Sequence, residues 1–369
     1  MNGRIGIVLT CLTIAAYANQ TKDCQPLLAK KCDNQPIREW VGEQQVSVCS
    51  YDCDLFSRDK KVLFVNVEFL YWTVTEGALD YAIKMKKAAW GNPTDAVGHY
   101  QRAEFDWRPG LRVSFGYFNA PHYWDAYAQY TYFHATGHEK VKKPHNPTRF
   151  LNGTWPQPDP SGDVPLSHAS SSIGLTMNLL DLLATRRFHP NPHLRIRANG
   201  GIAIGLLRQN WEINYRDTNW NKSHLHNNWH FGGAGIQFGG IVDWFMGKGG
   251  YYLTAGSSLS FLAGSYKNVT KQKSTFSGPG FDPSLPLRNA HYQDTRLIPH
   301  FRIYAGPSWQ QSFTRFRTEV QLAYELNIWA NLHEVIRTSS DAPTAPKLTS
   351  LDSAWIGIQG VTVRWNLDF

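Results

Sequence analysis

The sequence has no long apolar run beyond its first twenty positions, and only 18% of its 369 residues are charged. Each spanning helix needs about 20 consecutive apolar residues, so the chain is not a polytopic helical membrane protein. Few charges together with 14% aromatic residues also exclude an intrinsically disordered chain. A membrane β-barrel is not excluded, because each barrel strand needs only about 10 residues with every second one apolar.

The first positions have the pattern of an export signal. Arg4 gives a positive start, an apolar stretch covers 5–16, and Ala16-Tyr17-Ala18 is a small-x-small cleavage site. The apolar stretch is too short to remain in a bilayer as a spanning helix. We therefore expect residues 1–18 to be a signal peptide that is removed on export.

Cysteine is scarce, with five residues, and one of them lies in the expected signal peptide. An even number of cysteines in the mature part of an exported chain suggests disulfides, with three intrachain pairings or links between chains as alternatives. A metal site is less favoured, because no histidine lies among these cysteines. Residues 19–61 are expected to form a periplasmic segment whose disulfide candidates are Cys24, Cys32, Cys49 and Cys53.

From Val62 onward, apolar residues recur at every second position in stretch after stretch. The clearest stretch is 315–329, where one face is apolar and the other is charged. Side chains on a strand point to opposite faces in turn, whereas a helix would scatter these residues around its axis. The apolar face of this stretch consists of Phe316, Thr318, Val320, Leu322, Tyr324, Leu326 and Ile328. Similar stretches lie at 62–72, 111–118, 193–208, 251–266 and 361–369.

The breaks between these stretches alternate in length. Long polar segments occur at 134–167, 209–228, 267–294 and 331–352, and shorter breaks near 119–122, 182–192, 244–250 and 312–315. Outer-membrane barrels have short turns on the periplasmic side and long loops outside. A soluble β-sandwich is the alternative, but tryptophans gather near the expected strand ends, as in an interfacial girdle.

We therefore predict an all-β fold, a transmembrane antiparallel β-barrel over residues 62–369. The expected number of strands is about 12, including two near 79–87 and 98–107, and between 10 and 16 are compatible with the pattern. Without those two strands the number is ten.

In such a barrel, the face opposite the apolar one lines the lumen. A charge facing lipid would cost about 2–4 kcal/mol near the midplane, so charged side chains are expected inside. Eight of the expected lumen residues are basic and six are acidic, which predicts at most a weak anion preference. The alternative is that many of these charges pair with one another and stabilise the barrel. The lumen candidates are Glu68, Asp80, Lys84, Arg112, Asp125, Arg195, Arg197, Asp243, Arg302, Arg315, Arg317, Glu319, Glu325 and Arg364.

Several segments, in this order along the chain, resemble the porin-like major outer membrane proteins of Legionella and of chlamydia-related bacteria. The resemblance covers about Val62 to Phe369. The matching segments are Phe69-Leu70-Tyr71-Trp72, Gly77-Ala78-Leu79-Asp80-Tyr81-Ala82-Ile83, Pro109-Gly110-Leu111-Arg112-Val113, Trp124-Asp125, Asn178-Leu179-Leu180-Asp181, Leu194-Arg195-Ile196-Arg197 before Gly200-Gly201, and Phe231-Gly232-Gly233-Ala234-Gly235.

The resemblance implies a homo-oligomeric β-barrel porin, with a trimer as one option, and outer loops that contact host surfaces. Phe369 is similar to the terminal residue by which such barrels are recognised for assembly. The cysteines before Val62 resemble those used for disulfide links to other envelope proteins, although this segment has no position-by-position match.

The expected function is passive diffusion of small polar solutes or ions through a charged, water-filled barrel. The barrel is expected to lie in the bacterial outer membrane, where its outer face contacts lipid. The alternative is a surface adhesin or structural envelope protein for which the barrel is only an anchor. A third reading, an outer-membrane lipase, lacks support because no nucleophile-elbow sequence is present. We expect no catalysis and no cofactor.

Two further patterns are expected to carry no site. Histidines at 134 and 138, and at 224, 226 and 230, lie in or beside polar segments, and we expect no metal there. The sequence has no Lys/Arg run with interleaved aromatic residues, so we expect no nucleic-acid binding. The densest basic cluster is expected in a solvated external loop and consists of Lys140, Lys142, Lys143, His145 and Arg149.

Overall fold

The computed structural model describes residues 61–86, 98–119, 123–147, 149–159, 164–191, 193–246, 250–278, 281–313, 316–339 and 348–369. All of these belong to the compact unit Val41–Phe369. The expected signal peptide and the segment with the four cysteines lie outside the described residues. Within the described ranges, no helix is long and apolar enough to cross a membrane.

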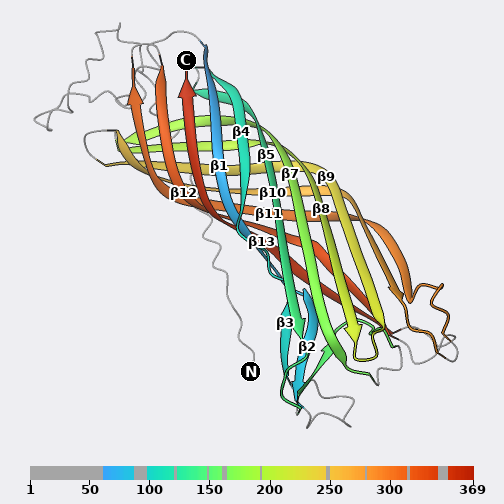
Figure 1. Ribbon diagram of the computed structural model, residues 1–369. Helices are drawn as coiled ribbons and strands as arrows, with labels where there is room; N and C mark the ends of the chain where they lie inside the picture. Colours follow the sequence, from blue (N-terminus) through green and yellow to red (C-terminus); the bar gives the residue numbers. More distant parts are fainter. Residues whose placement is uncertain are drawn as a thin grey trace, which may run out of the picture. The chain divides into compact units, whose positions relative to one another are not determined.

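The described chain consists of thirteen strands joined by turns and loops (Figure 1). They are β1 (Lys61–Glu76), β2 (Asp80–Lys86), β3 (Gly98–Arg102), β4 (Arg108–Asn119), β5 (Trp124–Lys142), β6 (Arg149–Gly153), β7 (Leu166–Asn191), β8 (Leu194–Asp217), β9 (Lys222–Phe245), β10 (Tyr251–Ser274), β11 (Arg288–Ser312), β12 (Arg317–Ser339) and β13 (Leu348–Asp368).

Ten of the strands close into an antiparallel ring. The order around it is β1, β4, β5, β7, β8, β9, β10, β11, β12 and β13, and β13 pairs with β1 to complete the circle. Such closure removes the unpaired strand edges that a bilayer could not satisfy. The predicted fold class is confirmed, and the number of strands in the ring is the lower end of the expected range.

The remaining three strands form a small insert and are not members of the ring. β2 pairs with β3 and with β6, and in the part of the chain that the structure describes, β6 pairs with the ring where Leu151 lies opposite Leu166 on β7. The expected strands near 79–87 and 98–107 therefore exist, but they do not belong to the barrel wall. With 7 and 5 residues they are shorter than the roughly 9–11 residues that a membrane-spanning strand needs.

The ring has two different ends. At the turn end, short connections join β4 to β5, β7 to β8, β9 to β10 and β11 to β12, and the C-terminus lies at this end (Figure 1). At the loop end lie the insert, the connection at 218–221, the end of β10 and the start of β11, and the end of β12 and the start of β13.

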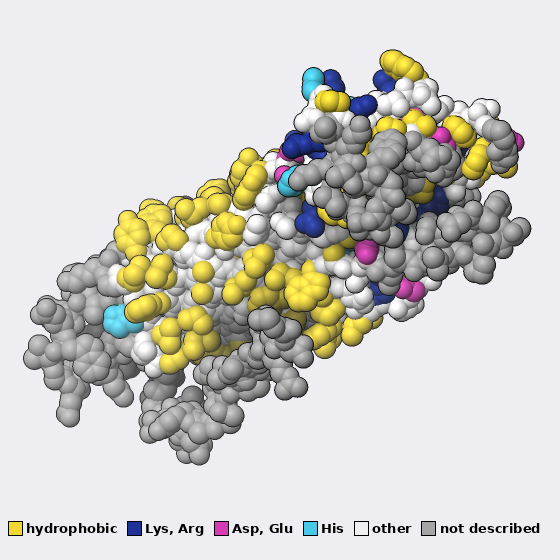
Figure 2. Space-filling model, turned by 90° about the horizontal axis from the view of Figure 1, so that it is seen from below, with side chains coloured by type: hydrophobic (Ala, Val, Ile, Leu, Met, Phe, Trp, Pro, Cys, Tyr) yellow, Lys and Arg dark blue, Asp and Glu magenta, His cyan; other side chains and the backbone are white. Residues whose placement is uncertain are grey.

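An apolar belt surrounds the half of the ring near the turn end. Val320, Leu322 and Tyr324 on β12 are all more than a third exposed, whereas Glu325 on the opposite face is buried. Figure 2 shows these outward hydrophobic side chains gathered over one stretch of the barrel, with Lys and Arg toward the other end. Exposed apolar side chains in a closed ring are those that contact hydrocarbon. The belt includes Phe69, Phe115, Tyr132, Ile202, Leu206, Ile236, Leu253, Leu297, Ile303, Leu322 and Val363.

Beyond the belt, the same strands reverse the polarity of their two faces. On β8, the outward positions change from Ile204 and Leu206 to the polar run Arg208, Asn210, Glu212, Asn214 and Arg216. The inward positions change from Arg195 and Arg197 to the buried run Leu207, Trp211, Ile213 and Tyr215. We call the part of β5 and β7–β10 beyond the belt, residues 133–142, 166–177, 207–217, 222–231 and 264–274, the extension.

The extension corrects the expectation of long polar loops. Most of 209–228, and parts of 134–167, 267–294 and 331–352, are paired strand. Of the basic cluster expected in a loop, Lys140 and Lys142 lie on β5 and Arg149 on β6. Outside the bilayer, water solvates polar outward side chains, so a paired strand no longer needs an apolar outer face there.

An apolar core fills the extension and holds the insert. Trp211 packs against Trp155 with ring centroids 5.9 Å apart, and Trp229 lies 5.8 Å from Tyr266. The Tyr215 hydroxyl donates a hydrogen bond to the backbone carbonyl of residue 81 on β2. The loop end of the ring is therefore built like the interior of a water-soluble barrel.

Replacing Leu322 with arginine should lower the free energy of unfolding by about 2–4 kcal/mol, because the guanidinium would face hydrocarbon within the belt. Asn210→Arg, at an outward position of the extension, should change it by less than about 0.5 kcal/mol. Urea titrations of both variants and of the unmodified protein in lipid vesicles measure the difference. Equal unfolding free energies for the two variants would show that Leu322 does not face lipid.

Candidate functional site: the charged lumen

The inner face of the ring is ionic at the level of the belt. Alternation along each strand places Glu68 on β1, Arg112 on β4 and Glu325 on β12 opposite the apolar outward positions, and all three are buried. A charged group inside the ring avoids the cost of facing lipid, but it also leaves bulk water, so it needs partners. The geometry of those partners defines the candidate site.

Five of these side chains form one group, the central cluster. The Arg112 guanidinium lies between two carboxylates, with Nη1 2.5 Å from Glu68 Oε2 and Nη2 2.8 Å from Glu325 Oε1. Arg364 Nη2 lies 2.7 Å from Glu68 Oε1, and Arg302 Nε lies 2.8 Å from Glu325 Oε1. The central cluster thereby joins β1, β4, β11, β12 and β13, which are neighbours in the ring.

Neutral side chains satisfy further hydrogen-bonding positions of the cluster. Arg112 Nε donates to Thr131 Oγ1 at 2.9 Å. The Glu325 carboxylate accepts from Asn327 Nδ2 at 3.1 Å and from Thr362 Oγ1 at 3.3 Å. The Glu325 carboxylate therefore accepts hydrogen bonds from four side chains, on β4, β11, β12 and β13, and is the centre of the cluster.

Three smaller ionic groups lie nearer the turn end. Asp243 accepts from Arg195 at 2.7 Å and from Arg197 at 3.0 Å, and Thr254 donates to it at 2.9 Å. The Arg187 guanidinium contacts both carboxylate oxygens of Asp125 at 3.0 Å.

The third group, Arg317 with Asp368 at 2.8 Å, ties the start of β12 to the end of β13. Because most of these side chains are arranged as mutual partners, the expectation that lumen charges stabilise the barrel describes the geometry well. A buried ion pair contributes little net stability, but removing one partner is costly.

A small polar cavity lies among these groups. Its lining includes Arg195, Arg197, Arg317, Glu319 and Arg364, and about 70 Å³ of it is available to water. Because one water needs roughly 15 Å³ by this measure, the cavity has room for a few molecules. The ionic part of the lumen is therefore narrow and closely packed.

An apolar layer follows the ionic groups toward the loop end. Trp72 comes after Glu68 on β1, Phe133 comes after Thr131 on β5, and the Trp72 and Phe133 ring centroids are 5.4 Å apart. Arg112 lies 5.3 Å from the Trp72 ring, a cation–π contact that joins the central cluster to the layer. The apolar layer belongs to the same buried cluster as Leu70, Leu262, Trp329 and Ile358.

Ten of the predicted pore-lining residues lie on the inner face of the ring. They are Glu68, Arg112, Asp125, Arg195, Arg197, Arg302, Arg317, Glu319, Glu325 and Arg364. Asp243, also expected in the lumen, is one of their partners. Lys84 and Asp80 lie on β2, which belongs to the insert and not to the ring. Arg315 and the four cysteines Cys24, Cys32, Cys49 and Cys53 lie outside the described residues.

Among the described residues at the level of the belt, sequence reasoning missed three inward charges, at Asp181, Arg187 and Asp368. Asp181 accepts from Gln129 at 3.2 Å, and the other two complete the ion pairs described above. Arg187 lies in a stretch expected to be a turn, but β7 continues to Asn191. The signal for Asp181 and Asp368 was present, because both occupy the phase opposite to apolar neighbours.

The side chain of Phe369, the expected assembly signal, is about half exposed. Its backbone N–H donates to the Leu63 carbonyl at 2.9 Å, and its carbonyl accepts from the Leu63 N–H at 3.0 Å. The last residue therefore continues the β1–β13 pairing at the seam where the ring closes.

The histidines at 134 and 138 and at 224, 226 and 230 lie at alternate outward positions of β5 and β9. Over the described ranges, no group of three or more His, Cys, Asp or Glu side chains is placed to hold a metal ion. His134 Nδ1 lies 2.9 Å from Thr176 Oγ1, and His224 Nδ1 lies 2.7 Å from Asn214 Oδ1.

A closed antiparallel ring with an apolar outer belt and an ionic inner face defines an outer-membrane β-barrel protein. Residues 57–369 match the family described as the Legionella pneumophila major outer membrane protein precursor. The chain belongs to this family, and its location is the bacterial outer membrane. The resemblance seen in the sequence is thereby confirmed.

Comparison with solved structures finds barrels of low similarity. The outer membrane protease OmpT from Escherichia coli has a TM-score of 0.39 and 10% identity, over 84% of this chain and 96% of that one. A FadL homologue from Pseudomonas aeruginosa has a TM-score of 0.25 and 7% identity, over 87% and 93%. The Pseudomonas putida toluene transporter TodX has a TM-score of 0.26 and 7% identity, over 87% and 92%. Scores this low say nothing about substrate or activity. Comparison with curated protein sequences found no match.

Replacing Glu325 with glutamine should lower the free energy of unfolding by about 3–5 kcal/mol, because three guanidinium groups would then share one carboxylate. Adding Arg302→Met to this variant should restore part of the loss by removing one surplus cation. Glu212→Gln, whose carboxylate lies 3.6 Å from His226 near the outer surface, is the charge-matched control. Urea titrations in vesicles give all three values. A double variant no more stable than Glu325→Gln would contradict the coupling of Arg302 to Glu325.

Proposed function

We propose that the protein is a porin, which allows small polar solutes or ions to diffuse passively through its charged lumen. The observation that carries this proposal is the series of ionic groups on the inner face of a closed ring. It begins with Asp125 and Arg187 near the turn end and reaches the central cluster around Arg112. Membership of a major outer membrane protein family supports it.

The orientation of the barrel follows from its two ends. Outer-membrane barrels place their short turns in the periplasm and their longer connections outside. The turn end would then face the periplasm, and the extension with its insert would project from the cell surface. A solute leaving the periplasm would meet the ionic groups first and the apolar layer second.

The charge of the lumen predicts little selectivity. At the level of the belt, the described inward positions carry seven arginines, namely Arg112, Arg187, Arg195, Arg197, Arg302, Arg317 and Arg364. They carry as many carboxylates, namely Glu68, Asp125, Asp181, Asp243, Glu319, Glu325 and Asp368. Since these charges cancel, even the weak anion preference expected from the sequence should be small.

One observation favours a second candidate function. The apolar layer and the core of the extension close the lumen at the loop end, where Trp72, Trp211 and Trp229 are all buried. A barrel closed in this way would serve as the anchor of a surface adhesin or structural envelope protein, and the insert and outer connections would be its functional part.

Single-channel recording in planar bilayers separates the two functions. The porin should show regular conductance steps, and Trp72→Ala should enlarge them because it removes a ring from the apolar layer. Trp365→Ala, on the outward face, should leave them unchanged, since that side chain is 56% exposed within the belt. Regular steps only after Trp72→Ala would indicate a closed anchor, and no steps in either protein would contradict the porin.

The reversal potential under a salt gradient tests the charge balance. It should lie close to zero for the unmodified protein, and Glu325→Gln should move it toward anion selectivity because the lumen gains one net positive charge. A strongly cation-selective unmodified protein would contradict the assignment of these residues to the lumen.

A further inference from the structure

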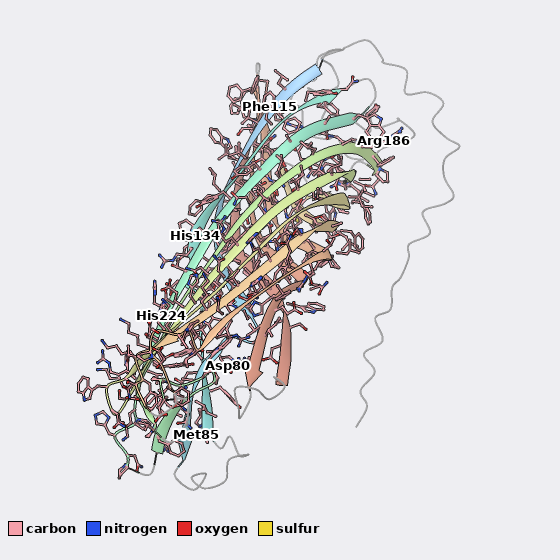
Figure 3. All side chains as sticks on the ribbon, turned by 90° about the vertical axis from the view of Figure 1, so that its right-hand side faces the viewer. Asp80, Met85, Phe115, His134, Arg186 and His224 are labelled. Atoms are coloured by element: carbon pink, nitrogen blue, oxygen red, sulfur yellow. The ribbon has the colours of Figure 1, made fainter. Side chains whose placement is uncertain are left out.

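The outward face of the extension carries a concentration of cations. Lys140 and Lys142 lie on β5, Arg208 and Arg216 on β8, and Lys267 and Lys271 on β10. We call these six residues, with the histidines between them, the cationic face. Figure 3 shows where it lies: Phe115 is in the belt, His134 is further along the barrel, and His224 is nearer the loop end.

Strand register brings the first row of this face together. His134 lies opposite Thr176, Thr176 opposite Arg208, Arg208 opposite His230, and His230 opposite Lys267. Neighbours across paired strands have Cβ atoms about 5 Å apart, so one headgroup can reach several of these side chains. Tyr132 and Leu206 lie two residues from His134 and Arg208 toward the turn end, and they are the last members of the belt on β5 and β8.

The cationic face has little opposing charge. Among the described outward positions of the extension, Glu212 is the one carboxylate, and it lies beside His226. No salt bridge joins any of the six Lys and Arg residues to a carboxylate within the described ranges. Burial, together with Arg216, Lys142 and Lys140 nearby, lowers the pKa of His168, which lies among them on β7.

We propose that the cationic face binds the phosphate groups of the phosphorylated glycolipid in the outer leaflet. Lipid phosphates lie directly beyond the hydrocarbon, which is where the row containing Arg208 and Lys267 begins. The belt below it would contact the acyl chains of the same lipid. Arginine binds phosphate through paired N–H donors, and lysine contributes a second point charge. The proposal depends on the orientation given under the proposed function and does not depend on conduction.

The test uses the full chain purified in detergent. Arg208→Gln with Lys267→Gln removes both full charges of the first row. Arg102→Gln with Arg186→Gln is the matched control, because it removes two exposed arginines, on β3 and near the turn end of β7. The probe is a glycolipid with a bisphosphorylated glucosamine disaccharide, and native mass spectrometry measures the bound fraction as its concentration rises.

The first-row variant should bind this glycolipid about tenfold more weakly than the unmodified protein, since two charge-assisted contacts are lost. The control variant should bind it normally, and raising the salt concentration should weaken binding to the unmodified protein. Equal binding by the first-row variant would overturn the proposal, and so would equal binding of the dephosphorylated glycolipid.

A soluble sulfated polysaccharide is the competing ligand. If it bound the face and the glycolipid did not, the face would belong to a soluble polyanion and the proposal would fail. Single-channel recording of the unmodified protein keeps the two proposals apart. An absence of conductance in the unmodified protein would overturn the porin and leave the lipid-binding result standing.

Discussion

The structure depends on one constraint, which is that the two faces of each strand meet different surroundings and exchange them partway along. Near the turn end, the outer face meets hydrocarbon and the inner face holds ionic groups; near the loop end, the outer face meets water and the inner face holds a dry core. On β8 the exchange occurs between Leu206 and Arg208 on the outside and between Arg197 and Leu207 on the inside. The edge of the belt therefore marks where the membrane ends and where the ionic lumen gives way to the apolar layer.

The central cluster follows from this constraint. A closed ring at the level of the belt cannot direct Glu68, Arg112 and Glu325 outward without exposing them to lipid, and it cannot bury them singly without a large desolvation cost. Arranged as alternating partners within 2.5–2.8 Å, they satisfy one another across neighbouring strands. Such an arrangement favours one pairing of the strands over others, because shifting β12 by one residue would place Glu325 in the belt.

Much of the barrel could be predicted from the sequence, because alternation is a local property. The two-residue period alone predicts Leu322 and Tyr324 on the outer face and Glu325 on the inner face, and the structure agrees. The sequence does not predict the extension, since polar outward residues such as Asn210 and Asn214 fall in the segment 209–228, which the pattern indicates as a loop. A signal existed in the change of phase from Ile202, Ile204 and Leu206 to Trp211, Ile213 and Tyr215. The pairing of the charges could not be predicted, because it depends on the register between strands distant in sequence. The position of the insert could not be predicted either, because it depends on long-range contacts of Trp155 and Tyr215.

The same exchange of surroundings links the lumen to the cell surface. Trp72 contacts the central cluster through Arg112 on one side and the apolar layer through Phe133 on the other. Further along, Trp211 contacts Trp155 and Tyr215 bonds to the backbone of β2, which joins that layer to the insert. Under the proposed function, the ionic groups would determine which solutes enter, whereas the packing of the apolar layer and insert would determine how readily they leave. Permeation and the exposure of the outer segments would then depend on the same aromatic contacts, because loosening Trp72 or Trp211 alters both.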